Sequence, residues 1–229
     1  GEVKTTFEKK ADDFLRIMNN WLRDNLTRAL SIQVRSETLT PAEVMARYHL
    51  ALRDLTLRET VFRLAAACLG EYFTSRYPDY PRFTTVEFTR DTIPHGAEAA
   101  LRAIAGGPLT RPAQSVLEAL RIGRLEGSQL IYQLDDSPYA HWLMEQIEAQ
   151  PEGKVLNRSA LLQGASGAER DVRFGLEPEW LLVVLAALVR QKAITIQLPA
   201  RRLDSDDLAE AARLGIAELV KFTSVGRPR

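Results

Sequence analysis

The sequence predicts a mainly α-helical protein in which a multi-helical N-terminal part is followed by a winged-helix-like α+β unit. Three observations lead to this fold class. Apolar residues recur at three-and-four spacing over much of the chain, several segments carry a helix-start signature, and the C-terminal half alternates helical patterns with short β-rich runs. The 229 residues are 45% hydrophobic and 26% charged, an ordinary globular composition that allows one large domain or two small ones. We expect two.

The N-terminal part opens with a long amphipathic helix over residues 5–30. Its apolar residues lie on one helical face, and they are Phe7, Ala11, Phe14, Leu15, Met18, Trp21, Leu22, Leu26 and Leu30. Residues 31–39 then place polar residues on either side of Ile32 and Val34, which indicates a short strand or an extended connector.

The next helix has the strongest start signal in the chain. Thr40 is an N-cap residue, Pro41 occupies the first helical position, and Glu43 stands three residues after the cap. Two helices are expected, over 41–55 and 57–76.

Breaks after these helices suggest where the chain divides. The segment 77–83 holds two prolines, which cannot continue a helix, so the first subdomain ends or bends there. A short helix over 96–105 then runs into Gly106-Gly107-Pro108, a linker-like break. We therefore expect a helical connector domain over 1–106 and a winged-helix-like domain over 107–229.

The second part shows helices and short strands in a recognisable order. We expect helices that begin after Thr110 and after the N-cap Ser137, then an extended piece at 154–157, a brief helix at 158–163, a loop at 164–168, an apolar helix at 177–191, a strand at 193–198, an acidic helix at 205–214 and a strand at 218–225. Helix, strand, helix, helix, strand, connector and strand is the order of a winged helix.

Bulk properties exclude several classes of function. The 30 basic and 30 acidic side chains cancel, so no overall field attracts the chain to nucleic acid or to a membrane. The longest apolar run, 180–189, is far shorter than the roughly 20 residues that a bilayer requires, and no signal peptide is visible. The single cysteine, Cys68, lies in an apolar run, which fits a core thiol in a reducing cytoplasm.

Catalytic and cofactor motifs are also missing. A phosphate-binding loop needs Gly-x-x-x-x-Gly-Lys-Ser/Thr, and only Gly153-Lys154 occurs. His49, His95 and His141 are isolated from one another and from the cysteine, so we expect no metal centre. Ser166, in Gly-Ala-Ser-Gly, lacks the strand and the second spaced glycine of a nucleophile elbow. We predict a non-enzymatic chain without a cofactor.

Two groups of side chains have both a functional and a structural interpretation. The acidic residues Asp135, Asp136, Asp204, Asp206 and Asp207 could work as acid–base pairs, but their place before expected helices favours a role at helix N-termini. An aromatic cluster with nearby arginines could stack on bases or hold a peptide, although packing of a helix end against a proline-bent loop is favoured; its aromatic members are Tyr72, Phe73, Tyr77, Tyr80 and Phe83.

A winged helix suggests DNA binding, and the sequence places limits on it. The apolar helix at 180–189 offers no side chain that reads base edges, so it is expected to be buried. The exposed basic candidates are Lys192, Arg201 and Arg202 on the expected wing. They are sufficient for weak phosphate contacts that are indifferent to sequence.

Four stretches of the second part carry a family resemblance. They are Gly107-Pro-Leu-Thr-Arg-Pro-Ala-Gln-Ser-Val-Leu-Glu-Ala-Leu120, Lys154-Val-Leu-Asn-Arg-Ser-Ala-Leu-Leu162, Leu176-Glu-Pro-Glu-Trp-Leu-Leu-Val-Val-Leu-Ala-Ala-Leu-Val189 and Ile194-Thr-Ile-Gln-Leu-Pro-Ala-Arg-Arg-Leu-Asp204. Together they resemble a region downstream of the ATPase domain in very large bacterial P-loop proteins of phage-exclusion gene clusters of the BREX and Pgl type. The resemblance covers about 107–225.

The resemblance implies that this chain is a non-catalytic piece of an ATP-binding protein that restricts phage. None of that family's nucleotide-binding residues falls within it. The expected partners are other parts of the parent protein or subunits of a defence complex. Two further hypotheses stay open, namely a DNA-contacting winged-helix domain and a stand-alone enzyme of unrecognised type.

Overall fold

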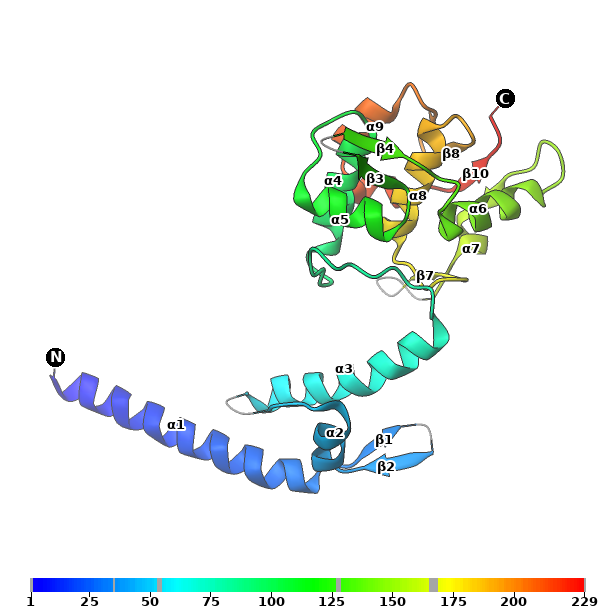
Figure 1. Ribbon diagram of the computed structural model, residues 1–229. Coiled ribbons are helices and arrows are strands. Elements are labelled where there is room, and N and C mark those ends of the chain that lie inside the picture. Colours follow the sequence, from blue (N-terminus) through cyan, green and yellow to red (C-terminus); the bar gives the residue numbers. More distant parts are fainter. Residues whose placement is uncertain (1, 35, 53–54, 127–128, 165–168, 229) are drawn as a thin grey trace. The chain divides into compact units, whose positions relative to one another are not determined.

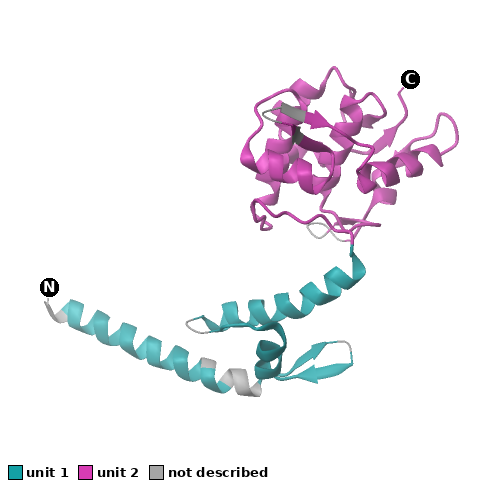
Figure 2. Cartoon of the chain, viewed as in Figure 1, with its two compact units in different colours: residues 1–78 teal, residues 79–229 magenta. Residues whose placement is uncertain are grey.

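The computed structural model describes residues 2–34, 36–52, 55–126, 129–164 and 169–228. The chain divides into two compact units, residues 1–78 and 79–229, shown in different colours in Figure 2. Among the described residues, helices predominate and the strands form small antiparallel sheets. The predicted mainly α-helical class with an α+β part is therefore confirmed.

In Unit 1 the described residues form three helices and one hairpin. Its elements are α1 (Glu2–Ala29), β1 (Ile32–Val34), β2 (Glu37–Leu39), α2 (Pro41–Tyr48) and α3 (Leu57–Arg76). The segment expected as a single strand or connector pairs with itself, because Ile32 lies opposite Leu39 in an antiparallel register. The buried apolar core of this unit is small, and its members are Leu39, Val44, Leu52, Leu64 and Cys68.

Local hydrogen bonds explain where α2 and α3 begin. At Thr40 the side chain accepts from the backbone N–H of Glu43, and the Glu43 carboxylate accepts from the backbone N–H of Thr40, as the sequence predicted. The same reciprocal pair joins Thr56 and Glu59 at the start of α3. α2 ends earlier than the predicted residue 55, because His49 adopts a left-handed conformation with φ of 52°.

The expected domain boundary at 106–107 is wrong. In Unit 2, α4 (Ile93–Ile104) and α5 (Arg111–Ala119) belong to one core, and the glycines between them form a tight turn. The N–H of Gly107 donates to the carbonyl of Arg102 at 2.8 Å, and Gly106 has a φ of 93°. These glycines therefore cap a helix rather than link domains, and the chain divides at the proline-containing segment after residue 78.

Unit 2 contains the remaining elements, labelled where possible in Figure 1. After α5 they are β3 (Gly123–Glu126), β4 (Gln129–Tyr132), α6 (Pro138–Glu148), β5 (Leu156–Asn157), α7 (Arg158–Leu161), β6 (Leu162–Gln163), β7 (Arg170–Asp171), α8 (Pro178–Arg190), β8 (Thr195–Gln197), β9 (Arg202–Leu203), α9 (Leu208–Leu214), α10 (Ile216–Leu219) and β10 (Ser224–Gly226). The β3–β4 hairpin and β9 were not expected from the sequence. The strand expected at 218–225 is shorter, because its first residues belong to α10.

The apolar helix α8 is the centre of the Unit 2 core. Every side chain from Trp180 to Val189 is buried, as predicted. Phe83 and Phe88 pack on Trp180 with ring centroids 5.0 and 5.2 Å away, so the segment before α4 covers the start of α8. The expected loop at 164–168 lies almost entirely outside the described residues.

One four-stranded antiparallel sheet has the strand order β5-β10-β8-β9. Because successive side chains of a strand point to opposite faces, the register separates two rows of residues. The inner row is apolar and buried, and consists of Leu156, Val225, Ile196 and Leu203. The outer row is polar, and consists of Asn157, Ser224, Gln197 and Arg202.

Candidate functional site

The three basic residues predicted to contact DNA have different environments. Lys192 is exposed and follows α8 with a φ of 60°. Arg201 is partly buried, and its Nη1 donates to Glu210 at 2.6 Å. Arg202 is exposed on the outer row of the sheet. Of the three, Arg202 lines a cavity together with other cationic side chains, Lys154 and Arg227.

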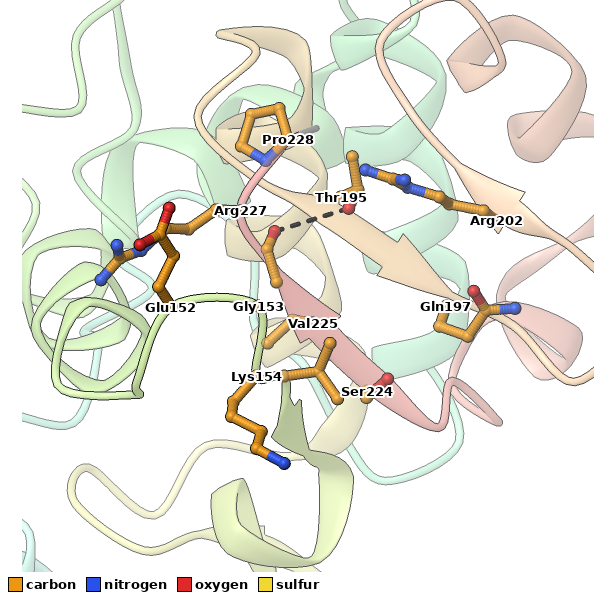
Figure 3. Close-up of a pocket in the computed structure, with 12 residues that line it drawn as sticks. Glu152, Gly153, Lys154, Thr195, Gln197, Arg202, Ser224, Val225, Arg227 and Pro228 are labelled. Atoms are coloured by element: carbon orange, nitrogen blue, oxygen red, sulfur yellow. Dashed lines mark hydrogen bonds between the residues drawn. The ribbon is translucent and has the colours of Figure 1, made fainter.

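That cavity, which we call the sheet hollow, lies on the outer face of the four-stranded sheet and has a volume of about 390 Å³ (Figure 3). Its floor is formed by the strands β8, β9 and β10. The segments 152–155 and 227–228 complete the lining. In Figure 3, Arg202 stands on one side, while Glu152, Lys154 and Arg227 stand on the other.

The small residues of β10 explain why the outer face of the sheet is hollowed. Ser224 and Gly226 are the outer-facing residues of β10, between the longer side chains of β8 and the segment that precedes β5. A Cβ added at Gly226 would approach Cγ1 of Val155 to 3.1 Å. A larger residue at Gly226 would therefore crowd the 152–155 segment.

The sheet hollow combines hydroxyl groups with an excess of cations. Thr195 and Ser224 are 9% and 8% exposed, and the Thr195 hydroxyl donates to the carbonyl of Gly226 at 3.5 Å. Arg227 is held by a bond of 2.8 Å from its Nη2 to the carbonyl of Glu148. Arg202 makes no ion pair or hydrogen bond through its guanidinium group within the described parts of the chain.

Several acidic and serine candidates from the sequence accept hydrogen bonds from nearby backbone N–H groups. Asp204 accepts from the backbone N–H of Asp206 at 2.9 Å, and Asp207 accepts from that of Asp204 at 3.2 Å, so these carboxylates shape the turn before α9. Ser137 caps α6 by accepting from the N–H of Ala140. Ser166 lies outside the described residues.

The histidines and acidic residues form no metal centre in the described part of the chain. No group of three or more His, Cys, Asp or Glu side chains comes together there. His49, His95 and His141 are each exposed. Of the helices that the structure describes, none combines the length and apolar character needed to cross a bilayer.

The predicted aromatic cluster is divided between the two units. Phe73 and Tyr77 contact each other in Unit 1, with centroids 5.1 Å apart. Tyr80 and Phe83 pack in the Unit 2 core, and the Tyr80 hydroxyl donates to Glu177 at 2.7 Å. Burial and the neighbouring Glu177 carboxylate raise the pKa of Tyr80 far above its usual value. The packing interpretation therefore accounts for Tyr80 and Phe83.

A second surface feature, which the sequence pattern alone could not evaluate, is the apolar face of α1. In a solvated helix of a globular protein, such a face packs against a core. Here large side chains of α1 are exposed, and we call them the α1 apolar face; the exposed fractions are Phe7 68%, Phe14 72%, Leu15 52%, Ile17 61%, Met18 50% and Trp21 62%.

Comparisons with known proteins place the chain in a family. Residues 1–77 match the model described as the DUF6079 third domain, and residues 93–227 match the model described as the fourth domain of that family of unknown function. The first match coincides closely with Unit 1 and the second lies within Unit 2. No curated protein and no solved structure matches the chain. The chain belongs to the DUF6079 family, of which it contains the third and fourth domains.

Proposed function

We propose that this chain is a non-catalytic interaction module of a larger, ATP-binding phage-resistance protein, and that the α1 apolar face is its main contact surface. The phage-resistance part of the proposal rests on the sequence resemblance over residues 107–225. The interaction part rests on the exposed apolar side chains of α1. The family descriptions support a multidomain parent, because they number these two domains third and fourth.

The spacing of the α1 apolar face favours a helical partner. Phe7, Ala11, Phe14, Met18 and Trp21 follow one another at alternating intervals of four and three residues. This interval keeps a seam of side chains facing a second helix. Burying one large apolar side chain contributes about 1.5–3 kcal/mol, so several of them would stabilise a docked helix appreciably. We infer that a helix of the parent protein covers this face.

The topology of Unit 2 supports the winged-helix interpretation. α6, β5, α7, α8, β8 and β10 occur in the expected order, with the additional strands β6 and β7 between α7 and α8, and β10 lies between β5 and β8 in the sheet. β9, α9 and α10 are an insertion between the last two strands. Because α8 is buried, this unit is suited to protein contacts more than to reading a DNA groove.

Point changes in α1 of the full-length parent test the proposal. Trp21→Asp places a charge in the apolar seam, and we expect it to abolish protection of cells against phage, measured as efficiency of plating. Asn20→Asp is the matched control, since it adds the same charge to the neighbouring position on the other side of the helix, and it should leave protection intact.

Two outcomes would contradict the proposal. Full protection by a parent that carries both Phe14→Asp and Trp21→Asp would exclude the α1 apolar face as an essential contact. Unchanged phage sensitivity after deletion of the parent gene would remove the phage-resistance role. Protein abundance measured by immunoblot must be equal in all strains, so that loss of protection reflects lost contacts.

A weak DNA contact is the alternative, and exposed Arg202 favours it. This alternative requires duplex binding that is indifferent to sequence and that weakens as salt increases. Fluorescence anisotropy at several salt concentrations measures it. Lys192→Glu with Arg202→Glu is the informative variant, because changing Arg201 would also break its ion pair with Glu210.

A further inference from the structure

We propose that the sheet hollow is a binding site for a small phosphorylated, hydroxyl-bearing molecule, such as a sugar phosphate. The key observation is that Arg202, Lys154 and Arg227 line one cavity, whose polar floor contains the Thr195 and Ser224 hydroxyls. The interaction role of α1 does not require this site.

The charges of the sheet hollow select for an anion. Three cationic side chains and one carboxylate, Glu152, line it. Arg202 extends from the sheet without an ion pair in the described parts of the chain, so its guanidinium fork is available for a bidentate contact with a phosphate. The Lys154 ammonium is exposed, and its flexible stem allows it to reach a bound anion. The cations therefore supply the main attraction.

The floor of the sheet hollow is suited to hydroxyl-bearing ligands. Thr195, Ser224 and Gln197 present neutral donors and acceptors on the same face of the sheet, because the register aligns them across neighbouring strands. Glu152 at the rim can accept hydrogen bonds from ligand hydroxyls. These groups match a ligand that carries several alcohol groups beside its phosphate.

The volume and the lining residues of the sheet hollow favour a small ligand without an aromatic ring. About 390 Å³ is in the lower part of the range for small-molecule sites. The lining contains no Phe, Tyr or Trp that would stack on a nucleobase. A phosphorylated sugar or polyol therefore fits better than a nucleotide or a single strand of nucleic acid.

Calorimetric titration of the full chain with ribose 5-phosphate, ribose and inorganic phosphate tests the site at constant ionic strength. We expect saturable one-to-one binding of ribose 5-phosphate, weaker binding of inorganic phosphate and none of ribose. Backbone amide resonances of Gly153 and Gly226 should shift during the titration, which locates the ligand. If inorganic phosphate binds as tightly as ribose 5-phosphate, the hydroxyl-bearing part of the proposal is wrong.

Variants separate a specific site from general charge attraction. Arg202→Gln should weaken ribose 5-phosphate binding about tenfold, since it removes a charge-assisted contact. Thr195→Val keeps the side-chain shape and should weaken binding by a few-fold. Arg213→Gln is the matched control, because Arg213 is exposed on α9 and does not line the sheet hollow. Melting temperatures should be equal for Arg202→Gln and Arg213→Gln.

Three results would overturn the proposal. They are the absence of saturable binding, an equal loss in Arg202→Gln and Arg213→Gln, and amide shifts confined to residues away from the sheet hollow. A duplex DNA that binds more tightly than ribose 5-phosphate, and that loses this binding in Arg202→Gln, would assign the surface to nucleic acid instead.

Discussion

At the residue scale, Asp171 shows how one buried carboxylate can organise a turn. Asp171 lies on β7, which pairs with β6, and its side chain is fully buried. Its Oδ1 accepts from the backbone N–H groups of Arg173 and Phe174 at 2.9 and 2.8 Å, and its Oδ2 accepts from that of Leu176. These bonds hold the turn at residues 173–176, immediately before α8.

Replacing this carboxylate tests that role. Asp171→Ala leaves three backbone donors without their acceptor, and we expect the free energy of unfolding to fall by about 2–4 kcal/mol. Asp171→Asn retains one acceptor oxygen and should cost less. Urea denaturation followed by tryptophan fluorescence measures both variants. Equal stability of the wild type and Asp171→Ala would show that the turn forms without these bonds.

The same residue predicts a pH dependence. Burial raises the pKa of Asp171 above its usual value, although its hydrogen bonds from three backbone N–H groups oppose the change. A raised pKa in the folded state means that the protonated acid stabilises the fold, and that this contribution is lost as pH rises through the folded-state pKa. The stability of the wild type relative to Asp171→Asn should therefore decrease as pH rises above 3.8.

At the scale of an element, α8 organises Unit 2. Its apolar residues occupy all sides of the helix, a pattern typical of a helix that is enclosed by others. α4, α6, α9 and β8 pack against it. At its C-terminal end, Arg190 donates to the carbonyl of Ile104 and lies over the Tyr132 ring, which joins α8 to α4 and to the β3–β4 hairpin.

A charge within α8 should unfold Unit 2. Leu185 is fully buried, so Leu185→Asp would place an unpaired carboxylate in the core and should cost more than about 4 kcal/mol. Leu214→Asp is the matched control, because Leu214 is 45% exposed on α9 and should cost about 1 kcal/mol or less. Differential scanning calorimetry compares the two. A melting temperature for Leu185→Asp near that of Leu214→Asp would contradict the central role of α8.

At the scale of the whole molecule, the two units have separate cores. No buried residue belongs to both clusters within the described chain, and the Unit 1 cluster is much the smaller. Stability from apolar burial increases with the size of the core. Unit 2 is therefore expected to be stable by itself, whereas Unit 1 depends on additional contacts such as those proposed for the α1 apolar face.

Separate expression tests this division. We expect the full chain to melt in two transitions, with Unit 2 melting at the higher temperature. A fragment of residues 79–229 should be soluble and should melt cooperatively within a few degrees of that higher transition. A fragment that starts at residue 107, the boundary suggested by the glycine pair, should not fold, because it lacks the buried residues of α4. Independent folding of the 107–229 fragment would instead support a domain boundary between residues 106 and 107.

The sequence by itself determined most helices of this protein. Thr40, Pro41 and Glu43 act through local bonds, so the start of α2 could be predicted without knowledge of the rest of the chain. The burial of α8 was equally predictable, because its composition has no polar face to present to water. Capping and amphipathic patterns involve residues within about one helical turn of each other. They can therefore be predicted from the sequence without knowledge of the tertiary structure.

Only the tertiary structure decided which distant residues meet. The β9 strand and the sheet hollow depend on pairing between β8, β9 and β10, and their partners lie up to 31 residues apart, as for Thr195 and Gly226. Short strands carry little periodicity, so Arg202 could be identified as a basic candidate but not as a neighbour of Lys154 or Arg227. The sequence cannot distinguish a linker from a helix cap at Gly106-Gly107, because a glycine pair permits both; the packing of α4 against α5 and α8 makes it a cap.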